Sequence, residues 1–161
     1  MRIFFLSFML LVSLYPKEGM AQGLTVSVGQ ATASAGSTVC VPVHIIGMRR
    51  MLSMQYSVKW DSKVLELVDI KNFRLPGMTK ENFGMNQAPQ GILTTLWLDN
   101  SIKGVDLPNG TPMYQLCFRV KGKAGTSSVV QILQKPTPFE AINKFEQFVQ
   151  MSGVSGKVTV R

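Results

Sequence analysis

The side chains that could carry out chemistry are few and scattered. His44 is the only histidine, and it lies on the polar side of an alternating run. A metal site or a serine–histidine–aspartate triad would have to use it, yet no group of Cys, His and carboxylate side chains surrounds it. No G-x-S-x-G turn supplies a nucleophile either. We therefore interpret His44 as a surface residue and expect no metal and no other cofactor.

Carboxylates could still act in pairs, as they do in glycosidases. Several of them lie at turns, where an Asp side chain commonly hydrogen-bonds the backbone. The segment 104–110 has turn residues but no helix after it, so it does not predict a phosphate loop. The chain is not expected to be an enzyme. The carboxylates beyond the N-terminal segment are Asp61, Glu66, Asp69, Glu81, Asp99, Asp106, Glu140 and Glu146.

The elements that must position these residues are strands. Large and polar residues alternate along residues 52–60, which is the period of a half-buried β-strand. Its large side chains are Met54, Tyr56, Val58 and Trp60, and its polar ones are Ser53, Gln55, Ser57 and Lys59. A strand with a polar outer face, in a chain without catalytic residues, favours binding over catalysis.

Short runs of this kind follow one another with turn residues between them, which is typical of an all-β sandwich or jelly roll. Residues 72–90 are expected to form a long, partly ordered connection, and residues 136–143 an extended, irregular one. There is no internal repeat and no linker. The nine predicted strands cover residues 24–28, 38–46, 52–60, 64–70, 91–99, 111–121, 127–134, 145–151 and 156–160.

The N-terminus reads as a secretory signal peptide over residues 1–21, which leaves one domain over residues 22–161. Its apolar run is too short for a membrane span, which needs about 20 residues; the alternatives are a membrane anchor or a buried helix. After cleavage the protein is not expected to span a membrane, and we expect it to be secreted, periplasmic or at the cell surface. The net charge of +8 is spread along the chain without a basic stripe, so nucleic acid is not an expected partner.

Cys40 and Cys117 are the two cysteines, and each lies on the polar side of its alternating run. An exported protein matures where disulfides persist. If the two strands are neighbours, a cross-strand disulfide follows and closes a long loop. We favour this disulfide; the alternative is two free thiols.

The order of these elements resembles the cohesin family, the dockerin-binding modules of cellulosome scaffolds and of related exported proteins. The match covers nearly all of the chain after the signal peptide. The resemblance implies a nine-stranded jelly-roll sandwich, a fold shared with several carbohydrate-binding modules. The matching segments are residues 36–43, 53–61 with 64–66, 93–99, 106–110 leading into 116–120, and 156–160.

The resemblance also implies a binding face, because cohesins bind dockerin on the outer face of the sheet that contains this strand. Strand alternation independently predicts part of this face. If Trp97 points into the core, Leu96 and Leu98 must point outward. Exposed leucines beside a polar strand suit a protein partner, unless the 72–90 connection covers them. The expected partner-binding residues are Ser53, Gln55, Ser57, Leu96, Leu98 and Asp99.

Two functions remain open from the sequence. The first is a non-catalytic exported module that captures a protein partner, of the dockerin type or another. The second is a carbohydrate-binding module of the same fold, linked to polysaccharide binding or breakdown, which would stack sugars on exposed aromatic rings. Trp60, Trp97 and Tyr56 are expected in the core, so the candidate surface rings are Tyr114, Phe139, Phe145 and Phe148.

Overall fold

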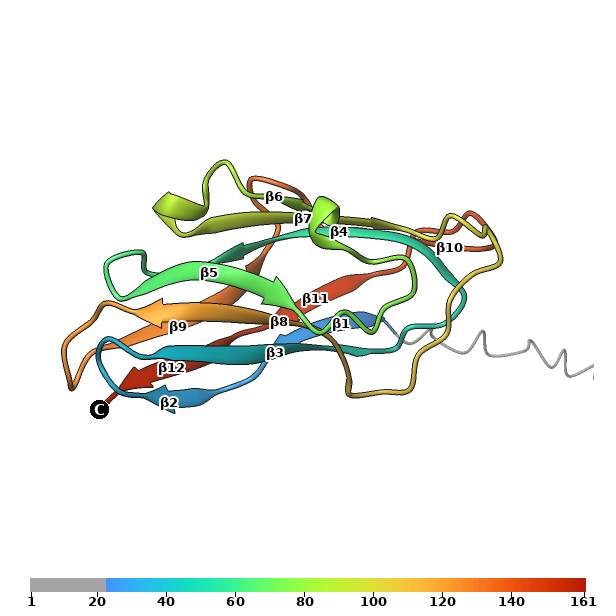
Figure 1. Cartoon of the computed structure of the whole chain (residues 1–161). Coiled ribbons are helices and arrows are strands. Elements are labelled where there is room, and N and C mark those ends of the chain that lie inside the picture. Colours follow the sequence, from blue (N-terminus) through green and yellow to red (C-terminus); the bar gives the residue numbers. More distant parts are fainter. Residues whose placement is uncertain (1–22) are drawn as a thin grey trace, which may run out of the picture.

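The computed structural model describes residues 23–161, and the expected signal peptide lies outside the described residues. Two β-sheets pack face to face as a sandwich (Figure 1), which confirms the all-β jelly-roll prediction. The five-stranded sheet has the order β11-β1-β3-β8-β5. Its strands are β11 (Met151–Val154), β1 (Leu24–Val28), β3 (Thr38–Ile46), β8 (Thr111–Val120) and β5 (Leu65–Lys71).

The seven-stranded sheet has the order β2-β12-β9-β4-β7-β6, and β10 pairs with β4 beyond the end of β9. Its central strand, β4, therefore has β7 on one side and two shorter strands on the other. The strands are β2 (Ala31–Ala33), β12 (Gly156–Val160), β9 (Ser127–Leu133), β4 (Met51–Lys59), β7 (Ile92–Leu98), β6 (Phe83–Gly84) and β10 (Glu140–Asn143). Two 3-10 helices, η1 (Lys80–Asn82) and η2 (Ala88–Gln90), flank β6.

The strand count of nine was wrong, because residues 23–161 form twelve strands. The extra strands β2, β6 and β10 have two to four residues, too few to show an alternating pattern. The predicted strand over residues 145–151 was also wrong. Asn143 accepts hydrogen bonds there from the backbone N–H groups of Phe145 (2.9 Å) and Gln147 (3.1 Å), which form a turn, and β11 begins only at Met151.

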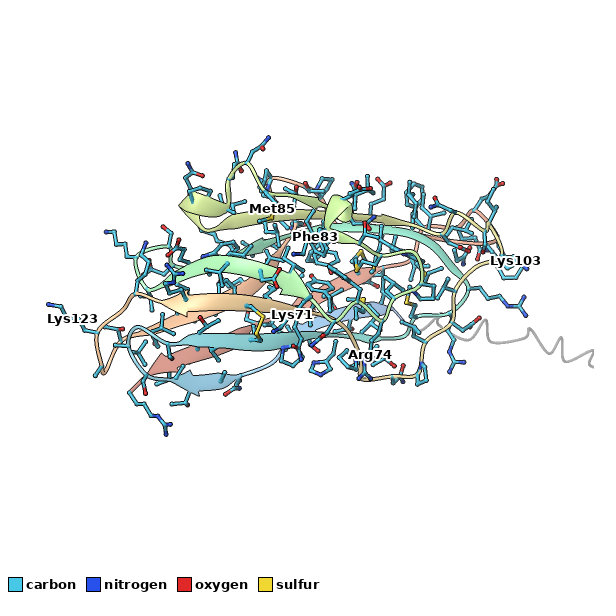
Figure 2. All side chains as sticks on the ribbon, in the orientation of Figure 1. Lys71, Arg74, Phe83, Met85, Lys103 and Lys123 are labelled. Carbon is cyan, nitrogen blue, oxygen red and sulfur yellow. A yellow bond between two sulfur atoms is a disulfide. The ribbon has the colours of Figure 1, made fainter. Side chains whose placement is uncertain are left out.

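Strand alternation carries large side chains from both sheets into one shared core. Tyr56 of β4 and Tyr114 of β8 are fully buried, and their hydroxyls share a hydrogen bond of 2.9 Å across the sandwich. Phe83 packs edge-on against Tyr114, with 5.0 Å between ring centroids, and Figure 2 shows it at the β6 side of the sandwich. Burial raises the pKa of both tyrosines, because it disfavours the ionised phenolate.

Cys40 of β3 lies directly opposite Cys117 of β8, and the two form a disulfide. The predicted pairing is therefore confirmed. Both side chains lie on the outer face of the five-stranded sheet, as the alternation of their strands indicated, and the bond is visible in Figure 2. It joins two neighbouring interior strands of that sheet across 77 residues of sequence.

Candidate binding face on the seven-stranded sheet

The outer side of β4 and β7 presents two leucines to solvent. Trp97 of β7 is fully buried, and its neighbours Leu96 and Leu98 are 48% and 52% exposed. The indole N–H of Trp97 donates to the carbonyl of Pro76 at 2.8 Å, which fixes the ring in the core. Because side chains alternate along a strand, that ring forces both leucines outward. The predicted outward orientation of Leu96 and Leu98 is therefore confirmed.

The polar residues of β4 lie directly beside those leucines. Antiparallel pairing places Ser53 opposite Leu98, and Gln55 opposite Leu96. Opposite residues in such a pair have their Cβ atoms about 5 Å apart, so the side chains share one surface. Ser53 and Gln55 are half-buried. We call Ser53, Gln55, Leu96 and Leu98 the β4–β7 face.

Ser57 does not belong to this face, although it lies on the same side of β4. Its side chain is 0% exposed. The Thr137 N–H donates to its Oγ at 2.8 Å, and its hydroxyl donates to the Thr137 carbonyl at 3.2 Å. The connection from β9 to β10, residues 134–139, thus crosses over the strand as a strap. The expectation that Ser57 is available to a partner was wrong, because a segment distant in sequence covers it.

Asp99 lies at the end of β7 and holds the loop that follows. Its carboxylate accepts hydrogen bonds from the Ser101 hydroxyl (2.7 Å), the Ser101 N–H (2.9 Å) and the Gly104 N–H (2.9 Å). The hydroxyl and backbone donors stabilise the ionised form and hold the pKa of Asp99 below its usual range. Gly104 has a positive φ of 81° and packs against the carbonyl of Arg50, where a Cβ would clash. The Asp99 carboxylate thus stabilises the loop that follows β7.

The 72–90 connection does not cover the leucines. Its strand β6 lies beside β7, with Phe83 opposite Thr95 and Gly84 opposite Thr94. The Asn82 side-chain amide donates to the carbonyl of Leu96 at 2.9 Å, so this contact is with the backbone at the strand edge. Leu96 therefore keeps its side chain free. A hollow of about 280 Å³ between β6 and the strap bounds the face at the Thr94 end.

The sequence missed the contribution of β10 to this surface. Glu140 lies opposite Gln55, and Ile142 lies opposite Ser53. Residues 136–143 were expected to be irregular, so nothing indicated that they pair with β4. The only signal for this strand is the alternation of Glu140, Ala141 and Ile142, in which Ala141 is buried.

The burial of the aromatic side chains was predicted correctly only in part. Tyr56, Trp60 and Trp97 are buried, as predicted. Tyr114 is fully buried too, so its interpretation as a candidate surface ring was wrong. Phe139 is half-buried, whereas Phe145 and Phe148 are exposed.

The remaining features concern metal binding and membrane spanning. His44 is half-buried on the outer side of β3. Within residues 23–161, no three His, Cys, Asp or Glu side chains are grouped so that they could hold a metal ion. In that same part of the chain no helix is long and apolar enough to span a bilayer.

Comparison with known proteins decides the family. The sequence profile of the cohesin domain matches residues 24–160. The chain belongs to the cohesin domain family. Among curated proteins, none matches it significantly.

Solved cohesins have the same fold as this one. The sixth cohesin of scaffoldin B from Acetivibrio cellulolyticus, solved with the Cel5 dockerin, superposes with a TM-score of 0.72 at 22% identity, over 86% of this chain and 99% of that one. The OlpA cohesin of Clostridium thermocellum, solved with a dockerin, gives 0.72 at 17% identity over 86% and 99%. A non-cellulosomal cohesin of Archaeoglobus fulgidus gives 0.67 at 18% identity over 86% and 91%. At these identities the likeness establishes the fold alone.

Proposed function

We propose that this cohesin domain is a non-catalytic, exported module that captures a protein partner of the dockerin type on its β4–β7 face. One observation carries the proposal: Leu96 and Leu98 are about half exposed on the outer side of β7, where nothing in the fold requires apolar residues. Exposed apolar side chains beside polar ones are characteristic of protein interaction sites.

Three further points support this proposal. The solved relatives include cohesins in complex with dockerins. The Cys40–Cys117 disulfide suits an exported protein, as does the signal-peptide pattern of residues 1–21.

Polysaccharide binding has weaker support. Sugar stacking needs exposed, coplanar rings, and Tyr114 is not available for it because it lies in the core. The exposed ring of Phe145 lies against a cation, with the Arg50 guanidinium carbon 5.6 Å from its centroid. No observation favours this second function over protein capture.

The test is affinity capture from the culture medium of the organism that makes this chain, followed by calorimetry with the captured protein in purified form. Leu96→Asp should abolish capture, because it places a charge at the centre of the apolar contact. Val154→Asp is the matched control: Val154 is 51% exposed on β11 in the other sheet, and its substitution should leave capture unchanged.

Thermal melts of both variants establish that each is folded. If the captured protein binds Leu96→Asp as tightly as the wild type, or if only Val154→Asp disturbs binding, the β4–β7 face is the wrong site.

A further inference from the structure

Lysine and arginine side chains that are far apart in sequence gather at the end of the sandwich that holds the β8–β9 hairpin. The Lys121 N–H of the hairpin donates to the Val64 carbonyl at 2.8 Å, which joins the hairpin to the turn after β4. The Gly125 N–H donates to the Val160 carbonyl at 2.9 Å, which joins it to β12. Figure 2 shows Lys123 at this tip of the molecule. We call residues 59–66, 119–131 and 156–160 the basic end, and its exposed cations are Lys59, Lys63, Arg119, Lys121, Lys123 and Lys157.

These cations are not neutralised by ion pairs within the described chain. The basic end contains two carboxylates, Asp61 and Glu66, against six cations. Asp61 acts within its own turn, where it accepts a hydrogen bond from the Lys63 N–H at 2.8 Å. Among residues 23–161, the one ion pair joins Lys80 to Asp69, outside the basic end. An excess of positive charge therefore faces solvent, where it attracts an anionic ligand.

A hollow of about 460 Å³ lies in the basic end, where the last residues of β4 meet the first residues of β9. A lysine ammonium group pairs with a carboxylate, and amide and hydroxyl groups donate to and accept from the hydroxyls of a sugar. The lining therefore suits a ligand that carries both carboxylate and hydroxyl groups. The exposed polar side chains around the hollow are Lys59, Asp61, Gln90, Ser127 and Gln131.

Backbone contacts hold the elements around the hollow in place. The Asp61 N–H donates to the Ser128 hydroxyl oxygen at 2.9 Å, which fixes the turn after β4 against β9. The Trp60 N–H donates to the Gly91 carbonyl at 2.9 Å, which fixes the end of η2 and with it Gln90. The hollow is thus formed before any ligand arrives, as most ligand sites are.

A second lysine lies on the same outer surface, at a separation that suits a polymer. Lys59 lies opposite Gln131 of β9, and Lys157 of β12 lies opposite Val129, two residues earlier in β9. All four side chains therefore point to one side of the sheet. Two strand spacings of about 4.8 Å and two residues of about 3.4 Å place Lys157 about 12 Å from Lys59. One sugar ring is too small to contact both lysines, whereas a chain of sugars can do so.

We infer that the basic end binds an anionic polysaccharide, such as a polymer of uronic acids, through Lys59, Lys157 and the hollow beside Lys59. This site goes beyond the proposed function and is separate from the β4–β7 face. Ser57 and Lys59 lie on the same side of β4, and the strap bonded to Ser57 crosses the strand between the hollow and Gln55. The domain can therefore hold a polymer and a protein partner at the same time.

Other polyanions suit this end less well. Single-stranded nucleic acids stack their bases on aromatic side chains, and the exposed rings of Phe145 and Phe148 lie in the turn after β10 instead. Attachment to a bilayer gains from the burial of apolar side chains, and Val129 is the one large apolar residue exposed in the basic end. An acidic sugar chain requires neither feature, because ammonium, amide and hydroxyl groups are sufficient to recognise it.

The first experiment measures the binding of polygalacturonate by calorimetry and compares it with the methyl ester of polygalacturonate, a neutral polymer of the same sugar. The wild type should bind the acid and not the ester. Its affinity should fall as salt is added, because salt screens exposed charges. Absence of binding to polygalacturonate, or equal binding of both polymers, overturns the inference.

The second experiment places the site by charge removal. Lys59→Gln/Lys157→Gln should weaken the binding of polygalacturonate about tenfold, because two exposed charge pairs are lost. Lys103→Gln/Lys144→Gln is the matched control: it removes the same charge from exposed positions outside the basic end, and Figure 2 shows Lys103 at the opposite tip. The control should bind within about twofold of the wild type, since its lysines lie beyond the Debye length of about 10 Å. Equal losses in both variants would mean that only net charge matters.

The third experiment tests the hollow and the class of polymer. Gln131→Ala keeps the net charge and should weaken binding about threefold, as expected for one lost hydrogen bond; unchanged binding would exclude the hollow. Vesicles of phosphatidylcholine and phosphatidylglycerol in equal parts, and single-stranded DNA, are the competing probes. Tighter binding to either than to polygalacturonate would overturn the choice of a polysaccharide. Thermal melts establish that each variant is folded, and because no protein partner is used, failure here leaves the proposed function unaffected.

Discussion

The outer faces of the two sheets are built by the same alternation and yet present different surfaces. On the five-stranded sheet, the central strands β3 and β8 carry Cys40 and Cys117 as a disulfide, flanked by polar side chains such as Gln115 and Arg119. On the seven-stranded sheet, β7 carries two half-exposed leucines, Leu96 and Leu98, beside the central strand β4. The first face is crosslinked near its centre by the disulfide, whereas the second exposes apolar side chains there.

The difference separates stability from recognition within a single domain. Burying a leucine fully is worth about 1.5–3 kcal/mol, and at Leu96 and Leu98 much of that gain is not realised in the isolated domain. A partner that covers both side chains would recover it on binding. The disulfide acts on the opposite face, so folding and binding can be changed separately by substitution.

Removing the disulfide tests this separation most strongly. The double substitution Cys40→Ala and Cys117→Ala should lower the free energy of unfolding by about 4.5 kcal/mol, as the chain-entropy model gives for a loop of this length. Urea denaturation measures the loss. Affinity for the partner, measured where the variant is still folded, should stay within about twofold; a large loss of affinity would show that the two faces are coupled.

Leu98→Asp tests the other side of the comparison. We expect partner affinity to fall about 100-fold, or about 2.7 kcal/mol, with little change in the melting temperature. Arg119→Asp, on the exposed side of β8, is the control and should bind normally. Comparable losses in both variants would mean that capture depends on net charge rather than on this face.

Alkaline pH should act on the core that both faces share. The raised pKa values of Tyr56 and Tyr114 mean that above about pH 10 the unfolded chain loses phenolic protons that the folded chain keeps. Their contribution to stability is complete below that pH and declines as the pH rises, by about 2 kcal/mol for the pair between pH 10 and pH 11. Denaturation at each pH, with Tyr56→Phe/Tyr114→Phe as the reference, isolates this contribution; identical pH profiles would contradict it.

Ser57 provides the smallest test. Ser57→Ala removes the hydrogen bonds to the strap and should cost about 1 kcal/mol of stability. Hydrogen exchange at the Thr137 amide should accelerate, while partner affinity should stay within about twofold. Unchanged stability with reduced affinity would show instead that Ser57 contacts the partner.

The sequence predicted those features that depend on alternation within one strand. The inward Trp97, the outward leucines and the shared polar side of the two cysteines all follow from a period of two. Tyr114 could also have been placed in the core, because it has the same parity as Leu116 and Phe118 in β8. The buried side of each long strand could therefore be predicted from the sequence alone.

What could not be predicted depends on segments far apart in sequence. Ser57 has the right parity for exposure, and only the strap 80 residues later buries it. Ile142 lies beside Ser53, and Phe148 beside Ile142, because β10 continues along β4 where β9 stops. Such pairing leaves no local pattern in a strand of four residues, so the pairing of β10 with β4 could not be predicted from the sequence.

The parallel pairing of strands near both chain ends has a mechanical consequence. β1 runs parallel to β11, and β2 runs parallel to β12, while β1 begins and β12 ends at opposite ends of the sandwich (Figure 1). A force that pulls residues 23 and 161 apart would act along these strands and slide them past their neighbours. The hydrogen bonds of each pair would then bear the load together rather than open one after another. This arrangement should let the domain resist tension applied between its two ends.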